Sequence, residues 1–371
     1  MKIGIDITPI IYGRGVSRYT SNLVEVLNKR SSAEVCVFGY SLRRRQILEN
    51  FIQKNKLKNF SLHSLPPSIM GSLWRMGQNK VKRHLPQIEL FHSWDWIQPP
   101  DQDLPLVSTI HDVSMIKFPE TAHSGILRAH QRSWKILKER QAQIIAVSQA
   151  SKKDIINLLG IPHYQVQVVH EALPNELKIT SQFLGEEKAE HIKDKLHLTR
   201  PYLLFVGTRE PRKNLARLIE AWKPLANDYQ LIVAGEKGWD KSEQIQHPNL
   251  RFLGQVNDGE LIVLYAEAEV FCYPSLYEGF GLPILEAFFH GAPVVTSNVS
   301  SMPEVAGNAA ELVNPESVES IRQGITTILN EPLEEQKKRL QRMIIRLQMF
   351  SWDRVADETI EVYKKAIQSR Q

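Results

Sequence analysis

Residues 270–290 read VFCYPSLYEGFGLPILEAFFH, and this one segment combines a strand, a glycine turn and a helix. Val270 to Tyr273 is a short run of apolar and aromatic residues, which is typical of a buried strand. Gly279 and Gly281 follow in the turn. The expected helix runs from 283 to 290 and begins with Pro283, at a position where a missing amide N–H costs nothing. Strand, turn and helix in this order form the repeating unit of a parallel α/β sheet.

The same alternation of apolar runs and amphipathic stretches recurs on both sides of this segment. We expect strands at 2–6, 34–38, 88–91, 106–110, 143–147, 202–206, 229–234, 250–252, 270–273 and 293–296. We expect helices at 17–30, 125–140, 151–159, 214–222, 258–266, 283–290, 333–347 and from about 353 to 368. From 174 to 200 the sequence is polar and charged, which indicates a linker with one short helix. The chain therefore divides into two α/β domains, at 1–175 and 195–350.

Length and composition agree with this division. The chain has 371 residues, and a domain has about 100 to 200. Hydrophobic residues make up 42% and charged residues 23%, which excludes disordered and fibrous classes. No apolar run approaches the roughly 18 residues that span a bilayer, and Asp6 interrupts the N-terminal apolar stretch, so we expect a cytoplasmic protein. Cys36 and Cys272 form no CxxC pair; we expect buried thiols, without a disulfide or a zinc site.

Positive charge is concentrated in the first half of the chain. Residues 41–90 contain ten Lys or Arg and only two Glu, a local excess of +8. Such a region can be a solvated helix face, a surface for an anionic membrane or acceptor, or a nucleic-acid site. Nucleic acid is the least favoured partner, because no interleaved aromatic residues or DNA-reading motif accompany the charge.

Two segments after expected strands of the second half indicate a phosphate site. Residues 207–214, GTREPRKN, lead from a strand into a helix that Asn214 is placed to cap. The start of a helix is already positive, so Arg212 and Lys213 are unfavourable there unless an anion neutralises them. Exposed basic residues at a helix start are the alternative.

The second of these segments is the turn of residues 279–282, Gly279, Phe280, Gly281 and Leu282. Its backbone N–H groups can face a ligand, and Glu278 and Glu286 place carboxylates on either side of them. Carboxylates bind sugar hydroxyls well, so a phosphate on the N–H groups with hydroxyls beside it indicates a nucleotide sugar. The alternative is a capped helix with solvated glutamates.

Strand ends in the first half carry weaker signals. The glycine loop of residues 12–19 opens a helix, but Arg18 stands where a dinucleotide-binding GxGxxG motif has its third glycine. His111 and Asp112 directly follow the strand 106–110. The aromatic loop of residues 92–96, HSWDW, can flank an acceptor or pack as an interdomain loop.

Taken together, these segments resemble the retaining glycosyltransferases of family 4. The resemblance rests on Glu278 and Glu286 in E-x7-E spacing, on FVGTREPRKN, on the glycine loop, on His111 with Asp112, and on residues 300–307, SSMPEVAG. It spans nearly the whole chain. It implies the GT-B fold, in which two Rossmann-like domains face each other across a cleft, with the donor held mainly by the second domain and the acceptor by the first. It also implies that the final helix, 353–371, crosses back to the first domain.

The resemblance further implies roles for single residues. Arg212 and Lys213 would hold the donor diphosphate, Glu278 a hydroxyl of the transferred sugar, and Glu286 the ribose. His111 would lie near the reacting sugar carbon. The remaining donor contacts would come from Gly15, Gly207, Arg209, Gly279, Phe280, Gly281 and Leu282. This sequence departs from the family's glycine loop, since Arg14 and Ser17 replace the outer glycines of that loop. The small residues that are common after the second Glu are replaced by residues 288–290, FFH.

The implied reaction moves a hexosyl group from a nucleotide sugar to a glycan or lipid-linked acceptor, with retained anomeric configuration and no metal or cofactor. GDP-mannose is the first expected donor and a UDP-sugar the second. A lipid-linked acceptor would place the protein peripherally on the inner face of the membrane, with the basic region against anionic lipid.

Three other readings are weaker. A metal-dependent inverting transferase needs an Asp-x-Asp site, which Asp101 and Asp103 formally supply in a Pro-rich turn. A dehydrogenase is disfavoured, because the sequence lacks the GxGxxG motif that binds a dinucleotide. A non-catalytic nucleotide-sugar-binding or scaffold protein would not need all of Glu278, Arg212 and His111.

Overall fold

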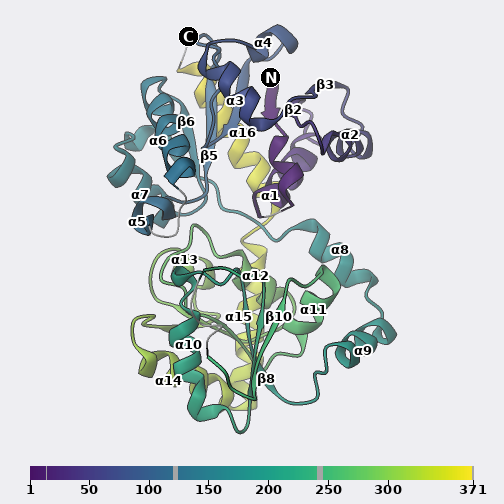
Figure 1. The fold of residues 1–371 in the computed structure, drawn as a ribbon, viewed down its shortest axis with the longest axis vertical. Helices are drawn as coiled ribbons and strands as arrows, with labels where there is room; N and C mark the ends of the chain where they lie inside the picture. The colour runs from purple at the N-terminus through teal and green to yellow at the C-terminus, as the bar shows by residue number, and fades with distance from the viewer. Residues whose placement is uncertain (14, 120–123, 240–244, 370–371) are drawn as a thin grey trace. The chain divides into compact units, whose positions relative to one another are not determined.

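The computed structural model describes residues 1–13, 15–119, 124–239 and 245–369, and the chain forms two compact units. The first unit comprises Met1–Pro174 and Trp352–Gln371, and the second Asn175–Ser351. Each unit contains one sheet of parallel strands with helices between them (Figure 1). The predicted α/β class, with two parallel sheets, is confirmed.

The sheet of the first unit has the strand order β3-β2-β1-β4-β5-β6-β7. Its strands are β1 (Lys2–Asp6), β2 (Glu34–Tyr40), β3 (Asn59–His63), β4 (Leu90–Trp94), β5 (Leu106–Ile110), β6 (Gln143–Ala146) and β7 (Val166–Val168). Its helices are η1 (Thr8–Tyr12), α1 (Gly15–Leu27), α2 (Arg45–Lys54), α3 (Pro67–Arg75), α4 (Val81–His84), α5 (Ser114–Lys117), α6 (Ser124–Glu139), α7 (Gln149–Leu159), η3 (His163–Gln165) and α16 (Trp352–Gln368).

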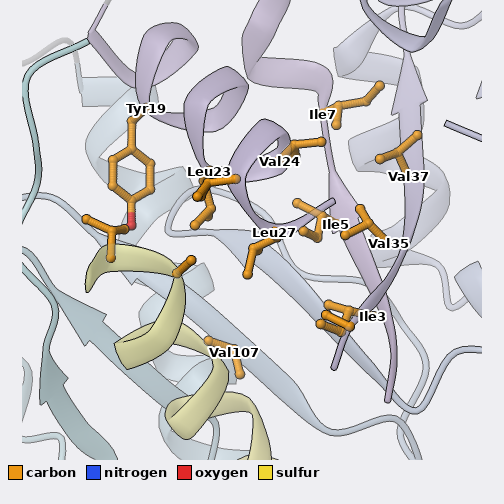
Figure 2. Packing of buried hydrophobic residues seen from close by; sticks show 14 of the residues in the cluster. Ile3, Ile5, Ile7, Tyr19, Leu23, Val24, Leu27, Val35, Val37 and Val107 are labelled. Atoms are coloured by element: carbon orange, nitrogen blue, oxygen red, sulfur yellow. The ribbon is translucent and has the colours of Figure 1, made fainter. Parts of the chain in front are cut away.

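Helix α1 covers one face of this sheet with an apolar stripe. Its buried residues Tyr19, Leu23 and Leu27 recur every four positions, and Val24 lies three positions before Leu27, so all four lie on one side of the helix. Figure 2 shows these side chains in one cluster with Ile3, Ile5 and Ile7 near β1 and with Val35, Val37 and Val107. Removing this apolar surface from water is the main force that holds helix and sheet together.

The C-terminal helix α16 completes the core of the first unit. It lies beside α1, β5 and β6 and is drawn in yellow in Figure 1. Trp352 Nε1 donates to the carbonyl oxygen of Leu173 at 3.0 Å, and the Tyr363 hydroxyl lies 2.7 Å from His92 Nδ1. Together with buried apolar residues of α16, which include Val355, Ile360 and Val362, these two polar contacts join the end of the chain to its first half.

The sheet of the second unit has the order β10-β9-β8-β11-β12-β13. Its strands are β8 (Tyr202–Val206), β9 (Gln230–Ala234), β10 (Leu250–Gly254), β11 (Val270–Tyr273), β12 (Val294–Ser297) and β13 (Glu311–Val313). Its helices are α8 (Asn175–Phe183), α9 (Glu186–Lys195), η4 (Pro211–Lys213), α10 (Leu215–Trp222), η5 (Lys223–Leu225), α11 (Asp258–Ala266), α12 (Leu282–Phe289), α13 (Met302–Ala306), α14 (Val318–Leu329) and α15 (Leu333–Gln348).

Several predicted elements needed correction. The segment 174–200 contains two helices, α8 and α9, where one short helix was expected. Both carry few apolar residues, so their hydrophobic periodicity is weak. The edge strands β3, β7 and β13 were missed, since they are short and only partly buried.

Strand β4 also differs from its prediction, because it covers Leu90–Trp94 where 88–91 was expected. His92 is completely buried in it, with Nε2 2.9 Å from the Thr109 hydroxyl. Burial lowers the pKa of His92 to about 3, so the imidazole is neutral. Its hydrogen bonds allow it to be buried in a strand, whereas the sequence suggested a loop at this position.

Both cysteines are buried, as expected, and both are free thiols. Among the described residues, no helix combines the length and the apolar character that a membrane crossing requires.

Candidate active site

The donor residues predicted in the second unit lie beyond the carboxyl ends of β8 and β11, which are neighbouring strands in the second sheet. Arg212 and Lys213 follow β8, and Glu278 follows β11. The two loops meet, because the amide of Leu276 donates to the carbonyl oxygen of Arg212 at 2.8 Å. Residues from distant parts of the chain are thereby brought to one edge of the sheet, where open α/β sheets bind ligands.

The loop after β8 is fixed by the loop after β9. The amide of Arg209 donates to the carbonyl oxygen of Glu236 at 3.3 Å. A Cβ on Gly235 would lie 2.1 Å from the Gly207 oxygen, and a Cβ on Gly238 would lie 1.9 Å from the Arg209 oxygen. Only glycine permits this approach. Sequence reasoning missed Gly235 and Gly238, although two glycines directly after a strand were a visible signal.

Arg212 and Lys213 form a buried charge cluster with glutamates. The Arg212 guanidinium donates to Glu278 Oε2 at 2.8 Å and also pairs with Glu210. Lys213 Nζ lies 2.7 Å from Glu278 Oε1 and 2.7 Å from the Tyr273 hydroxyl. Each of the three charged side chains of the Arg212–Lys213–Glu278 cluster is no more than 12% exposed.

This cluster modifies the expectation that an external anion neutralises the two cations. Burial opposes the charged form of Glu278, but the charges of Arg212 and Lys213 outweigh it and lower the pKa of Glu278 to about 2. Glu278 is therefore ionised, and it already supplies a negative charge between the two cations. Its partners were not predicted, because the ion pair joins residues 66 positions apart.

The backbone of Glu278 is held by the serines of residues 300–307, a stretch that also carries the family resemblance. The Ser300 and Ser301 hydroxyls donate to the Glu278 carbonyl oxygen at 2.7 and 2.9 Å. The Glu278 amide in turn donates to the Ser300 hydroxyl at 3.2 Å. This segment thus positions the carboxylate.

Asn214 does not cap the following helix as predicted. It adopts a left-handed conformation with φ of 63°, and its side chain makes no capping hydrogen bond. Instead the side-chain amide donates to the carbonyl oxygens of Pro274 and Pro315 at 2.9 and 2.7 Å. Asn214 therefore ties the start of α10 to the loop after β11.

Glu286 lies in helix α12 and is 8% exposed. Its Oε2 accepts a hydrogen bond of 3.0 Å from the Tyr265 hydroxyl. The helix starts as predicted, with Pro283 in its first turn. Gly281 stands at its N-cap in a left-handed conformation with φ of 109°, which favours glycine.

The side chains of the remaining candidate donor residues have different surroundings. The Phe280 ring is 4% exposed and packs edge-on against Phe350, with 5.5 Å between ring centroids, so only its backbone can serve a ligand. The Arg209 guanidinium stands 5.0 Å from the centre of the Phe252 ring. Arg212, which pairs with Glu278, is therefore better placed than Arg209 within the charge cluster. Gly279 and Leu282 are the first and last residues of the same turn.

In the first unit, His111 forms a pair with Glu171, a residue that sequence reasoning missed. His111 Nδ1 lies 2.8 Å from Glu171 Oε1, and Glu171 is 6% exposed. Trp94 stacks on the imidazole at 6.2 Å, and Tyr19 meets it edge-on at 4.9 Å. Burial opposes the charged imidazolium, but the hydrogen bond and charge of Glu171, with smaller contributions from other carboxylates, raise the pKa of His111 above its usual value. Glu171 follows β7, an unpredicted strand, so its position at the sheet edge was not foreseen.

Asp112 and Gly15 have simpler surroundings. Asp112 accepts the amide of Ser114 at 2.7 Å in a local turn, so His111 is the stronger functional candidate of the pair. A Cβ on Gly15 would meet no protein atom within 4 Å. The fold itself therefore does not require glycine there. Arg14 lies outside the described residues.

The aromatic segment 92–96 is mainly structural. His92 and Trp94 are completely buried in β4, so they cannot flank an acceptor. Asp95 is also buried, with Oδ2 3.3 Å from His130 Nδ1. Trp96 is the half-buried residue of the segment.

Asp101, from the formal Asp-x-Asp motif, caps a helix that lies about twenty residues earlier in the chain. Its carboxylate accepts the backbone amides of Val81 and Lys82 at 2.8 and 2.9 Å, at the start of α4. Within the described residues, no group of three or more His, Cys, Asp or Glu is arranged to hold a metal ion. Asp101 thus has a structural role that explains the motif.

Comparison with known families agrees with the class that this fold and site suggest. Residues 13–175 match the model of Glycosyltransferase Family 4, and residues 186–345 match that of Glycosyl transferases group 1. The chain belongs to the family 4 glycosyltransferases of the GT-B fold and is a glycosyltransferase. The family resemblance seen in the sequence is thereby confirmed.

The relatives in this family include several mannosyltransferases. The chain is 34% identical over 272 residues to the O-antigen chain mannosyltransferase B of Escherichia coli, and the match covers 70% of each protein. It is 30% identical over 246 residues to the serotype-specific mannosyltransferase WbdA of Escherichia coli, which is 63% of this chain but only 30% of that protein. It is 28% identical over 228 residues to the O-antigen chain mannosyltransferase RfbU of Salmonella typhimurium, with coverage of 59% and 60%.

Solved structures agree on the fold. A glycosyltransferase from Rickettsia africae has a TM-score of 0.73 at 16% identity, covering 99% of this chain and 98% of that one. Anabaena HepE in complex with UDP and glucose has a TM-score of 0.71 at 17% identity, covering 98% and 100%.

Proposed function

We propose that this enzyme transfers a hexosyl group from a nucleotide sugar to a glycan or lipid-linked acceptor. The first proposed donor is GDP-mannose, and a UDP-sugar is the alternative. Three relatives named as mannosyltransferases support a mannosyl donor. The observation that carries the proposal is the Arg212–Lys213–Glu278 cluster beside the turn of residues 279–282.

The cluster suits the departure of a diphosphate. Glu278 lies 2.8 Å from Arg212 and 2.7 Å from Lys213. We infer that the donor diphosphate shares these cations, while the Glu278 carboxylate accepts a hydroxyl of the sugar. Negative charge grows on the diphosphate as the glycosidic bond breaks. Cations that are already fixed in place stabilise that charge more in the transition state than in the ground state.

Other residues receive proposed roles on the same basis. Glu286 would hold the ribose. Gly207, Arg209, Gly279, Gly281 and the backbone of Phe280 and Leu282 would complete the donor site. In the first unit, Gly15 would lie close to the donor phosphate, where the open space around its Cβ position leaves room for it. His111, oriented by Glu171, would lie near the reacting sugar carbon.

We propose retention of the anomeric configuration without an obligatory metal. No carboxylate is assigned as a nucleophile. The leaving diphosphate itself is therefore the proposed acceptor of the proton from the attacking hydroxyl, so that one bond to the anomeric carbon forms as the other breaks on the same face.

A pocket in the first unit suits an acceptor with an apolar part and a negative charge. It has a volume of about 450 Å3 and is lined by Ile11, Tyr12, Ser41, Leu42, Arg43, Arg44, Pro66 and Pro67. Tyr12 and Leu42 are 48% and 57% exposed, so the pocket presents apolar surface to solvent. With the basic residues of 41–90, this pocket supports a lipid-linked acceptor and peripheral attachment to the inner face of the membrane.

The test is a panel of GDP-, UDP-, ADP- and dTDP-sugars, measured first with chelator and then with magnesium. We expect GDP-mannose to raise the melting temperature, because a ligand that binds only the folded state stabilises it. We also expect slow metal-free hydrolysis of the same donor, with release of the α-anomer before mutarotation. Binding of a donor without any hydrolysis or transfer would instead indicate a nucleotide-sugar-binding protein.

A further inference from the structure

Two buried tyrosines contact the charged groups of the candidate donor site. Tyr273 is the last residue of β11 and is 1% exposed, and its hydroxyl accepts a hydrogen bond of 2.7 Å from Lys213 Nζ. Tyr265 lies in α11 and is fully buried, and its hydroxyl donates to Glu286 Oε2 at 3.0 Å. Tyr273 thus contacts Lys213 and the neighbouring Glu278, and Tyr265 contacts Glu286. Neither tyrosine has a role in the function proposed above.

Tyr273 restricts a side chain that is otherwise flexible. The Lys213 ammonium sits at the end of four methylene groups and can rotate freely unless several partners hold it. Here Nζ lies 2.7 Å from both the Tyr273 hydroxyl and Glu278 Oε1, and 4.9 Å from the centre of the Tyr273 ring. Burial, with the nearby Glu278 carboxylate, raises the pKa of Tyr273 well above its usual value, so the phenol is neutral and can accept.

Tyr265 is itself held rigidly. Its ring stacks on His290, with 6.0 Å between centroids, and meets Phe271 edge-on at 5.1 Å. Phe271 also stacks on Tyr273 at 5.6 Å, so one aromatic side chain supports both tyrosines. Burial and the Glu286 charge raise the pKa of Tyr265 well above its usual value, so it remains a donor to the carboxylate.

We propose that Tyr273 and Tyr265 are positioning residues of the donor site: Tyr273 fixes the ammonium group of Lys213, and Tyr265 fixes the carboxylate of Glu286. This inference rests on the proposed function, in which Lys213 stabilises the leaving diphosphate and Glu286 holds the ribose. The two contacts then have different kinetic consequences, because charge develops on the diphosphate only during the reaction, whereas the ribose is bound equally in ground and transition states.

The experiment compares three Tyr→Phe variants in donor hydrolysis and transfer. We expect Tyr273→Phe to lower kcat about tenfold with little change in KM, and Tyr265→Phe to raise the donor KM about tenfold with little change in kcat. Tyr202→Phe is the matched control. Tyr202 is 2% exposed, and its hydroxyl donates to the Leu264 carbonyl oxygen at 2.9 Å, so it loses a buried hydrogen bond without touching a charged site residue.

A double variant tests whether Tyr273 acts through Lys213. If it does, Tyr273→Phe added to Lys213→Ala lowers kcat no further than Lys213→Ala alone. The inference would be overturned if the losses of kcat in Tyr273→Phe and Lys213→Ala multiplied in the double variant. It would also be overturned if Tyr273→Phe and Tyr265→Phe had the same kinetics as Tyr202→Phe. In either case turnover by the wild type would leave the proposed function intact. A wild-type protein that turns over no donor would overturn the proposed function itself.

Folding of each variant is checked by its thermal melt. Should Tyr273→Phe lose a cooperative melt, Tyr273→His replaces it, because the imidazole keeps a ring and an acceptor for Lys213. This variant is then expected to have a higher kcat than Lys213→Ala, and an equal or lower kcat would contradict the inference.

Discussion

At the scale of single residues, the Arg212–Lys213–Glu278 cluster combines two requirements. Two carboxylates, Glu278 and Glu210, balance the charges of Arg212 and Lys213 in the unliganded site, and the same cations remain near the turn where a diphosphate would bind. Breaking such a buried arrangement by removing one partner is costly, whereas exchanging one anion for another preserves the charge balance.

The first prediction concerns Lys213. Lys213→Ala should lower turnover by about two orders of magnitude, since it removes one contact to the charge that develops in the transition state. The measurement is kcat for the donor identified in the panel. Lys223→Ala is the control, because Lys223 is 42% exposed and pairs with Glu220 on the surface. Turnover near the wild-type value in Lys213→Ala would contradict the assignment.

The second prediction concerns pH. The pKa of Glu278 is lowered from 4.5 to about 2 in the folded state. A lowered pKa gives stability that is fully present above about 4.5 and is lost as the pH falls towards 2, by as much as about 3 kcal/mol. In urea unfolding between pH 7 and 3, the stability difference between wild type and Glu278→Gln should therefore shrink. The exposed Glu334→Gln should show no such trend, and a difference for Glu278→Gln that stays constant with pH would contradict this reading.

At the scale of elements, the candidate site depends on contacts between the loops that follow β8 and β11. Asn214 provides one such contact, with two hydrogen bonds from its amide to backbone carbonyl oxygens. The loop after β9 supports the same region, since Gly235 and Gly238 permit backbone contacts that a side chain would prevent.

The third prediction concerns this junction. Asn214→Ala should lower the free energy of unfolding by about 2 to 3 kcal/mol, because it leaves two buried carbonyl oxygens without their partner and adds strain at a φ of 63°. Chemical denaturation measures the loss. Asn214→Gly also loses the two hydrogen bonds but adds no strain, so it should be less destabilised than Asn214→Ala. Equal stability of wild type and Asn214→Ala would contradict the view that Asn214 stabilises the junction of the two loops.

The same scale explains which elements the sequence could predict. Strands buried on both faces, such as β8 and β11, were predicted with the bounds that the structure has, since a continuous apolar run marks them. The missed edge strands β3, β7 and β13 and the polar helices α8 and α9 lack this signal. Glu286 and Pro283 were placed correctly on α12, and Gly281 just before it, because local sequence determines a helix start.

At the scale of the whole molecule, the first unit carries both the basic region 41–90 and the apolar pocket beside Tyr12 and Leu42. Charge and exposed apolar surface in one unit are the combination that favours binding to an anionic lipid surface.

The fourth prediction tests this combination. The protein should sediment with vesicles that contain anionic lipid at low salt, and binding should weaken as salt screens the charges. Reversing two exposed charges, Arg43→Glu and Lys82→Glu, should lower the bound fraction several-fold. The same reversal at Lys337 and Lys338 in the second unit is the control, as both are about 60% exposed. Salt-independent binding, or none, would contradict the membrane proposal.

The class of this protein could be recognised without coordinates. Hydrophobic periodicity and glycine turns act between neighbouring residues, so they showed the alternation of strands and helices, and the E-x7-E segment indicated the family through its resemblance to the family 4 transferases. Which charges meet depends on the tertiary structure. Glu278 pairs with residues more than 60 positions earlier, His111 with Glu171, and Lys213 with Tyr273. These partners follow from the order of strands in each sheet, which local sequence patterns do not encode.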